Sequence, residues 1–177
     1  FGLAATEAAG QCSGNAANLF IPFTNDGTWT PVPRGDDNST WQITMPFTFT
    51  LYGLPYTRVF VNNNGNLTFN AAYGTFTASG FPSADAPPMV APFWADVDTR
   101  PVATGQAWYK FIGTNTFVVT WDNVGYYNQQ SNLRNTFQVA ISDGSNASFG
   151  PGNNCVMSYD NMCWTTGSAS GGSGGFG

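Results

Sequence analysis

The chain has 177 residues, 42% of them hydrophobic and 8% charged, with a formal net charge of −5 and no histidine. This length favours a single domain with a buried core, and the scarcity of Lys and Arg argues against a nucleic-acid partner. Without histidine the chain cannot build a Ser-His-Asp triad, a Cys-His dyad or a His-liganded zinc site, and no run of about 18 apolar residues encodes a membrane span.

Residues 1–17 are rich in Ala and Gly and precede the first segment typical of a folded domain, which begins near Leu19. They contain no initiator Met and no leader of charged and then apolar residues, which we interpret as a mature, exported product. We expect a flexible segment here. Because Phe1 and Leu3 are apolar, the alternative is that this segment pairs with an open sheet edge of a neighbouring subunit and joins the subunits into a polymer.

The segment from Trp41 to Tyr52 alternates apolar and polar side chains, and this period of two predicts a strand with one buried face. The expected buried positions are Trp41, Ile43, Met45, Phe47, Phe49 and Leu51. Pro46 has no backbone N–H to donate, so we expect this strand to lie at a sheet edge or to contain a bulge.

Two further β-prone runs, residues 59–61 and 67–69, are separated by the sequence Asn-Asn-Asn-Gly at positions 62–65. Asn-Gly between such runs predicts a tight hairpin whose two turn residues both have positive φ. A loop rich in Gly, Ser and Pro follows over residues 70–88. The apolar run Met89–Val97 is interrupted by Pro92.

Later strands are expected at residues 108–112, 117–121, 137–141, 155–159 and 162–165, and no segment shows helical apolar spacing. We therefore predict an all-β fold, a β-sandwich or related barrel of about eight to ten short, mainly antiparallel strands over residues 18–166. The Gly/Ser-rich residues 167–177 have the composition of a linker or flexible end.

Three cysteines, Cys12, Cys155 and Cys163, leave one thiol over if a disulfide forms. Cys155 and Cys163 flank the residues Asp160-Asn161. A hairpin turn there would bring the two thiols near each other, although a two-residue loop places Ser158 opposite Cys163. Cys12 as the partner of one of the other two, and three reduced thiols, remain alternatives.

Five segments together resemble the extracellular nidogen-like (NIDO) domain and occur in that family's order: residues 61–69 (VNNNGNLTF), 91–99 (APFWADVDT), 119–124 (VTWDNV), 135–138 (NTFQ) and 164–167 (WTTG). The family includes basement-membrane nidogen, inner-ear tectorin, mucin-type proteins and many bacterial secreted proteins. The resemblance implies matrix or adhesion work and carries over no catalytic residues. Family members usually continue with further apolar strand sequence after the Gly-rich stretch. We therefore expect either that the real protein is longer, or that the fold lacks closing strands and finds them elsewhere.

The main candidate for a ligand site is a group of aspartates. Asp96 and Asp98 are two residues apart, so their carboxylates share one face of a strand. With Asp122 or Asn123 they would form an all-oxygen cluster suited to Ca²⁺. The alternative is that they hydrogen-bond backbone N–H groups of turns. The run Asp36-Asp37-Asn38 lies in a separate polar loop and could ligate a cation, but its spacing fits no EF-hand loop, so we interpret it as a solvated turn.

Six tryptophans raise the question of sugar stacking, but most lie in strand patterns where core packing is the default. Tyr126 and Tyr127 precede a polar stretch and are the best candidates for an exposed contact with a glycan or a protein partner. We therefore expect a secreted, non-catalytic matrix, adhesion or fibre-forming module that associates with itself or with other extracellular proteins. The alternative is a calcium-dependent carbohydrate-binding module, and a hydrolase with paired aspartates is a distant third.

Overall fold

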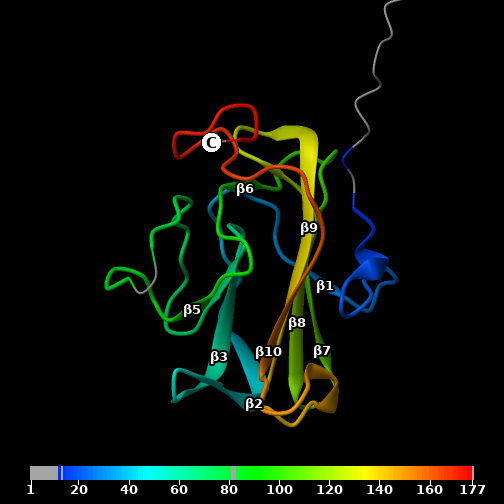
Figure 1. Ribbon diagram of the computed structural model, residues 1–177, viewed down its shortest axis with the longest axis vertical. Helices are drawn as coiled ribbons and strands as arrows, with labels where there is room; N and C mark the ends of the chain where they lie inside the picture. The colour runs from blue at the N-terminus through cyan, green and yellow to red at the C-terminus, as the bar shows by residue number, and fades with distance from the viewer. Residues whose placement is uncertain (1–11, 13, 81–82, 177) are drawn as a thin grey trace, which may run out of the picture.

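The computed structural model describes residues 12, 14–80 and 83–176. Within them ten strands form two antiparallel sheets that pack face to face, which confirms the predicted β-sandwich (Figure 1). The helices of this part are two three-residue 3-10 turns, Ala16–Asn18 and Ala147–Phe149. No helix among the described residues has the length and apolar character that a membrane crossing requires.

The larger sheet has six strands in the order β1-β7-β8-β9-β10, with β6 paired to the far end of β8. Its strands are β1 (Thr30–Pro31), β6 (Val97–Asp98), β7 (Gln106–Ile112), β8 (Thr116–Tyr126), β9 (Gln130–Ser142) and β10 (Cys155–Met162). The predicted pair at 108–112 and 117–121 is the β7–β8 hairpin, in which Ile112 pairs with Thr116. The strands β8 and β9 are 11 and 13 residues long, and therefore longer than expected.

The smaller sheet has four strands, β2 (Ile43–Leu51), β3 (Leu54–Asn62), β4 (Asn66–Thr68) and β5 (Met89–Val90), in sequence order. The alternation of β2 buries Met45, Phe47 and Phe49, as predicted. Pro46 lies on this edge strand within a register irregularity, which confirms its predicted place. The prediction for Trp41 is wrong, because it precedes the strand and is 92% exposed.

The β3–β4 connection is a hairpin with a three-residue loop, because Asn62 pairs with Asn66. The expected two-residue turn with two positive φ angles is therefore wrong. Gly65 has a φ of +77°, whereas Asn63 and Asn64 do not occupy the left-handed region. A loop of this length with glycine at its last position is a common alternative to the two-residue hairpin.

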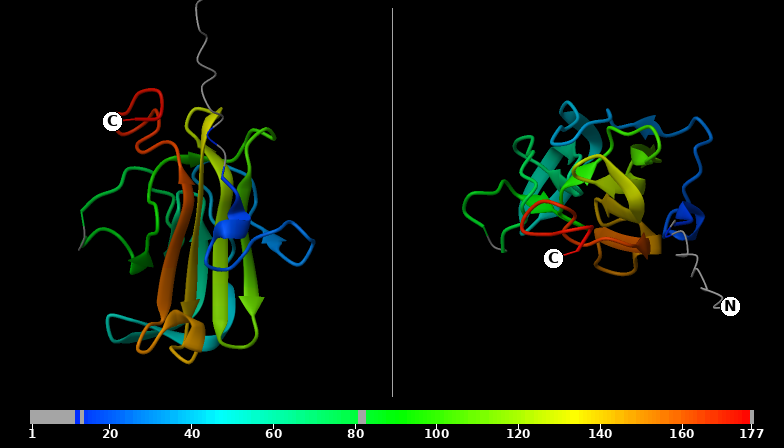
Figure 2. Two further views of the ribbon diagram at one scale, coloured as in Figure 1. Left: turned by 45° about the vertical axis from the view of Figure 1, so that its right-hand side comes forward. Right: turned by 90° about the horizontal axis from the view of Figure 1, so that it is seen from above.

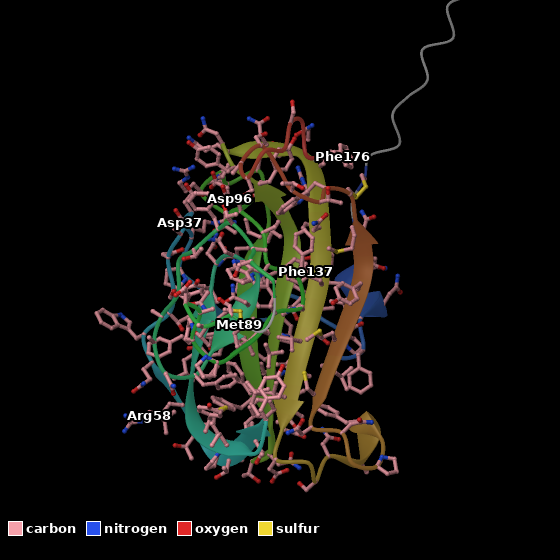
Figure 3. All side chains as sticks on the ribbon, turned by 60° about the vertical axis from the view of Figure 1, so that its left-hand side comes forward. Asp37, Arg58, Met89, Asp96, Phe137 and Phe176 are labelled. Carbon is pink, nitrogen blue, oxygen red and sulfur yellow. A yellow bond between two sulfur atoms is a disulfide. The ribbon has the colours of Figure 1, made fainter. Side chains whose placement is uncertain are left out.

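The main core lies between the two sheets and is dominated by aromatic and β-branched side chains. At its centre the rings of Trp121 on β8 and Phe137 on β9 stack with centroids 5.0 Å apart. Phe137 lies between the sheets (Figure 3), and both residues are fully buried. Alternate residues of the larger sheet, including Val118 and Ala140, face away from this core.

A second apolar cluster covers that outer face, and it is formed by the chain before β1. Leu19, Phe23 and Trp29 pack there against Val118 and Ala140, and Figure 2 shows this early segment beside the larger sheet. Phe1 and Leu3 lie outside the described residues.

A polar side chain fastens this early segment to the sheet. The fully buried amide of Gln138 on β9 accepts a hydrogen bond from the backbone N–H of Ile21 and donates one to the backbone carbonyl of Ile21, at 3.0 and 2.8 Å. The outer face of β9 is therefore buried as well as its inner face, which the alternating pattern did not predict.

The strand β10 runs without interruption through the residues for which a hairpin was considered. Tyr159 pairs with Phe137 and Asn161 with Thr136, so Asp160 forms a bulge in one strand rather than a turn between two. Beyond it, residues 167–176, whose composition is that of a flexible end, turn back on the domain. Thr165 donates a backbone hydrogen bond of 2.8 Å to Gly175.

Candidate functional site

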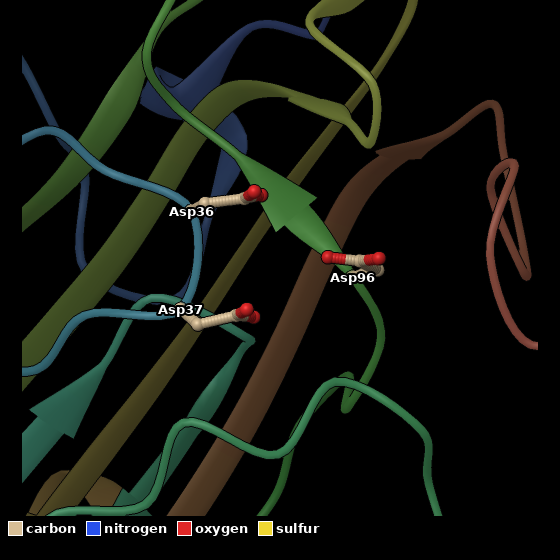
Figure 4. A group of neighbouring side chains, drawn as sticks. All are labelled: Asp36, Asp37 and Asp96. Atoms are coloured by element: carbon tan, nitrogen blue, oxygen red, sulfur yellow. The ribbon is translucent and has the colours of Figure 1, made fainter.

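Three carboxylates from two distant segments meet near one end of the sandwich, where Figure 3 labels Asp37 and Asp96. Asp36 and Asp37 lie in the loop after β1, and Asp96 immediately precedes β6. One oxygen from each of the three lies within 4.8 Å of the others, and their side chains point toward one another (Figure 4). Asp37 is exposed in a bend, as expected for a solvated turn, but the fold also places Asp36 and Asp37 beside the buried carboxylate of Asp96.

Two buried asparagines of the β3–β4 loop hold these segments together. The Nδ2 amide of Asn63 donates to the backbone carbonyls of Asp36, at 2.6 Å, and of Val97. The Nδ2 amide of Asn64 donates to Oδ1 of Asp37 at 2.8 Å, and its Oδ1 accepts from the backbone N–H of Val97 at 3.1 Å. Each amide thus links the loop after β1 to the start of β6.

The carboxyl group of Asp96 has the strongest perturbation in the cluster. Its residue is 3% exposed, and within the described part of the chain no donor reaches its buried Oδ1. Burial raises the pKa of Asp96 to about 7, and the carboxylates of Asp36, Asp37 and Asp98 add to the effect. Burial followed by the charge of Asp98 raises the pKa of Asp36 to about 6. Both effects disfavour the charged form of these acids.

Asp98 is engaged differently, although the sequence grouped it with Asp96. Its Oδ1 accepts from Nε of Arg100 at 2.9 Å, and its Oδ2 accepts from the backbone N–H of Gln129 at 2.8 Å. Burial raises the pKa of Asp98, but the hydrogen bonds from Arg100 and Gln129 outweigh it, so the pKa is lowered overall. Arg100 also reaches Oδ2 of Asp36 at 3.0 Å. Asp98 thus holds the guanidinium next to the cluster.

Asp122 takes no part in this arrangement. Its Oδ1 accepts a hydrogen bond from Nδ2 of the neighbouring Asn123 at 2.9 Å. Burial raises the pKa of Asp122, and the hydrogen bond from Asn123 opposes that shift. The predicted trio of Asp96, Asp98 and Asp122 is therefore not the group that the fold forms, since only Asp96 belongs to the three-carboxylate cluster.

The cluster has the chemistry of a site for a hard cation. Carboxylate oxygens are the preferred ligands of Ca²⁺ and Mg²⁺, and Asp36, Asp37 and Asp96 supply three of them. A hydrolase that uses Asp96 gains no support, because that side chain is buried and has little access to a bulky substrate.

Of the two tyrosines that the sequence singled out as exposed, one is buried and one lies at the surface. Tyr126 is 1% exposed and packs against Trp164, so the expectation that it forms a surface contact is wrong. Tyr127 is 40% exposed. Trp41, in contrast, protrudes beside a hollow of about 450 Å³ that Asp37 and Ser39 also line. The sequence placed Trp41 in the core because it continues the alternation of β2, although the strand begins only at Ile43.

Cys12 and Cys163 form a disulfide with a Cα–Cα distance of 6.0 Å, and Cys155 remains a free thiol. A bond between Cys155 and Cys163 is ruled out in this fold, since eight steps along one extended strand separate their Cα atoms by roughly 26 Å. Burial raises the pKa of the Cys155 thiol to about 11, which leaves it protonated and poorly reactive.

Comparison with known proteins gives consistent matches. The model of the family described as NIDO related matches residues 12–148. Human alpha-tectorin is 35% identical to this chain, and the match covers 87% of this chain and 8% of the relative. Chicken alpha-tectorin is 36% identical, with a match that covers 88% of this chain and 8% of the relative. Drosophila nidogen is 29% identical, with a match that covers 67% of this chain and 10% of the relative. The chain therefore spans about a tenth or less of these relatives. No solved structure matches.

Proposed function

Because the chain belongs to the NIDO-related family, we propose that it is a non-catalytic, secreted module of the extracellular matrix that acts through contacts with other proteins and with further copies of itself. Alpha-tectorin and nidogen are extracellular matrix proteins, which supports the location. Contacts of this kind would serve in adhesion or in the formation of fibres.

The observation that carries the self-association is the state of β10, an eight-residue strand at the edge of the larger sheet. Met157 pairs with Val139 and Tyr159 with Phe137, so both side chains share the face on which the core lies. Nevertheless Met157 is 41% exposed and Tyr159 is 49% exposed. A strand added at this edge would extend the larger sheet beyond β10 and place its own side chains beside Met157 and Tyr159.

The proposed occupant is the segment 1–11 of a second copy. It carries the apolar residues Phe1 and Leu3, and it enters the domain at Cys12. The disulfide to Cys163 ties that entry point to the residue that directly follows β10. Each copy thus has an apolar segment that starts at one end of an open edge, and pairing between copies would extend the sheet through main-chain hydrogen bonds.

The test is the assembly state of the full chain, measured by light scattering after size exclusion over a range of concentrations and by electron microscopy. We expect assemblies that grow with concentration. Removal of residues 1–10, which keeps Cys12, is expected to leave monomers. Met157→Lys is expected to weaken assembly, because a charged side chain on an edge strand disfavours pairing with an added strand.

Val102→Lys is the matched control, since Val102 is 87% exposed and lies in the loop before β7. It is expected to assemble like the parent chain. A parent chain that stays monomeric at every concentration, or assemblies that survive the removal of residues 1–10, would refute strand exchange.

A second candidate function, calcium-dependent carbohydrate binding, is favoured by Trp41. Its indole is 92% exposed beside a hollow lined by Asp37, Ser39 and Thr40, which combines an aromatic surface with hydrogen-bonding groups. A glycan array probed in calcium and in chelator tests this function. Trp41→Ala is expected to abolish any calcium-dependent signal, whereas Tyr52→Ala, at a side chain that is 90% exposed, is expected to keep it. An array without calcium-dependent signal would dismiss the candidate.

A further inference from the structure

The three-carboxylate cluster of Asp36, Asp37 and Asp96 contains two buried oxygens, Oδ1 of Asp36 and Oδ1 of Asp96, for which the described residues supply no hydrogen-bond donor. We propose that it binds one Ca²⁺ ion, with these three side chains as ligands. The group differs from the trio of Asp96, Asp98 and Asp122 that strand spacing suggested. The inference concerns the metal alone, and it holds whether the module works by protein contact or by glycan binding.

The buried carboxylate of Asp96 is the observation that points to a ligand. Asp96 is 3% exposed, and no hydrogen-bond donor among the described residues reaches its Oδ1. Figure 4 shows this side chain directed toward Asp36 and Asp37. Oδ1 of Asp36 is likewise buried without a donor in that part of the chain. A buried anion without a partner is unfavourable, and a cation between these oxygens would relieve that cost.

The balance of charge also leaves room for a cation. The charged groups that act on Asp96 are the carboxylates of Asp36, Asp37 and Asp98 and the guanidinium of Arg100. Arg100 is occupied by Asp98 and by Oδ2 of Asp36. When all four carboxylates are ionised, one positive charge faces four negative ones, and the buried oxygens without a donor belong to the proposed ligands.

The buried loop of Asn63 and Asn64 gives the site a fixed frame. Asn64 donates to Oδ1 of Asp37, and Asn63 donates to the carbonyls of Asp36 and Val97. Since both amides are almost fully buried, they hold the ligand segments without help from a metal. A site whose ligands are already in place loses less conformational entropy when it binds.

The donor set selects Ca²⁺ among common ions. All three ligands are carboxylates, which suit hard cations, and the chain has no histidine for a zinc or copper site. Ca²⁺ accepts six to eight oxygens in irregular geometry, so carbonyls and water can complete its shell, whereas Mg²⁺ demands a near-ideal octahedron. Calcium sites in extracellular modules have dissociation constants of about 10⁻⁴–10⁻³ M, and we expect a value in that range.

The test uses the full chain, stripped of metal with EDTA and then dialysed free of chelator. Titration with CaCl₂ in a calorimeter is expected to give one site per chain. A saturating amount is expected to raise the melting temperature by about 3–10 °C, because the ion binds only the folded state. MgCl₂ at the same concentration is expected to give a much smaller shift.

The decisive variants change charge and keep shape. Asp96→Asn and Asp37→Asn are each expected to weaken Ca²⁺ binding at least tenfold, because each removes a charged ligand. Asp37 is exposed, so Asp37→Asn tests the ligand set even if the buried position does not tolerate a change. Asp122→Asn is the matched control and is expected to bind like the parent chain. Circular dichroism confirms that each variant is folded.

Three results would overturn the proposal. They are a parent chain that shows neither calcium heat nor a calcium-dependent melting shift, folded ligand variants that keep the parent affinity, and loss of binding in Asp122→Asn alone. An equal shift with MgCl₂ would overturn the assignment to Ca²⁺. Metal binding is measured on the isolated chain, so its failure and a failure of self-association are separate results.

Discussion

The side-chain amide of Asn64 donates a hydrogen bond of 2.8 Å to Oδ1 of Asp37 across a sequence separation of 27 residues. A buried asparagine of the β3–β4 loop thereby orients a carboxylate of the loop after β1. Its neighbour Asn63 does the same for the backbone of Asp36. The Asn-Asn-Gly loop therefore connects β3 to β4 and also holds the loop after β1, with Asp36 and Asp37, in place.

Asn63→Ala tests the role of this loop. The substitution removes the donor to the carbonyls of Asp36 and Val97 and the acceptor for Oγ1 of Thr99, which leaves buried polar groups unpaired. We expect a loss of about 2–4 kcal/mol in the free energy of unfolding, measured with urea. Asn25→Ala, at an exposed loop position, is expected to change that free energy by less than about 0.5 kcal/mol. Equal effects of the two would contradict the assignment.

Gly65→Ala tests the turn itself. A Cβ at position 65 would lie 1.8 Å from the backbone oxygen of Phe93, and the residue has a φ of +77°. We expect the free energy of unfolding to fall by more than about 3 kcal/mol, because backbone must move. Gly53→Ala has a similar φ of +80° with open space around it, so it is expected to lose only about 1–2 kcal/mol. A smaller loss at Gly65 than at Gly53 would show that the close approach to Phe93 is not rigid.

The disulfide gives a third prediction. Cys12 and Cys163 are 151 residues apart in sequence, so their bond closes most of the chain into a loop. Replacement of both by Ser is expected to cost about 3–5 kcal/mol, mainly because the unfolded chain gains freedom. Peptide mapping without reduction is expected to show the Cys12–Cys163 link, with Cys155 alkylated only after denaturation. A link that contains Cys155 would contradict the structure.

The raised pKa values of Asp36 and Asp96 predict how stability depends on pH in the presence of chelator. The pKa values are about 6 and about 7 in the folded protein, against an ordinary value of 3.8. Between these limits the folded state binds more protons than the unfolded state, so stability falls as pH rises from about 4 to about 7. The lowered pKa of Asp98 acts in the opposite direction, but its contribution is lost only at lower pH.

Urea midpoints measured across this pH range check the prediction. Asp96→Asn is expected to flatten the upper part of the curve, because the neutral amide does not titrate. Stability that climbs steadily from pH 4 to pH 7 in chelator would show that other groups dominate.

The alternation of apolar and polar residues was sufficient to predict the all-β class of the fold. The alternation of Met45, Phe47 and Phe49 predicted the strand β2 with its buried face, and Pro46 placed it at an edge. Burial of one face repeats every two residues along a strand, so a single segment carries that information. The absence of histidine likewise excludes catalytic sites that need this residue, and the order of the family motifs indicates an extracellular module.

The tertiary structure decided what depends on contacts between distant segments. Asp36 and Asp37 become part of the three-carboxylate cluster only because the β3–β4 loop and the start of β6 pack beside them. The outer face of β9 is buried only because the segment around Ile21 crosses it. Neither contact can be predicted from the local periodicity, because the sequence does not show whether a polar side chain is exposed to water or contacts a distant part of the chain. Spacing along one strand therefore identified Asp96, and only packing in three dimensions chose its partners.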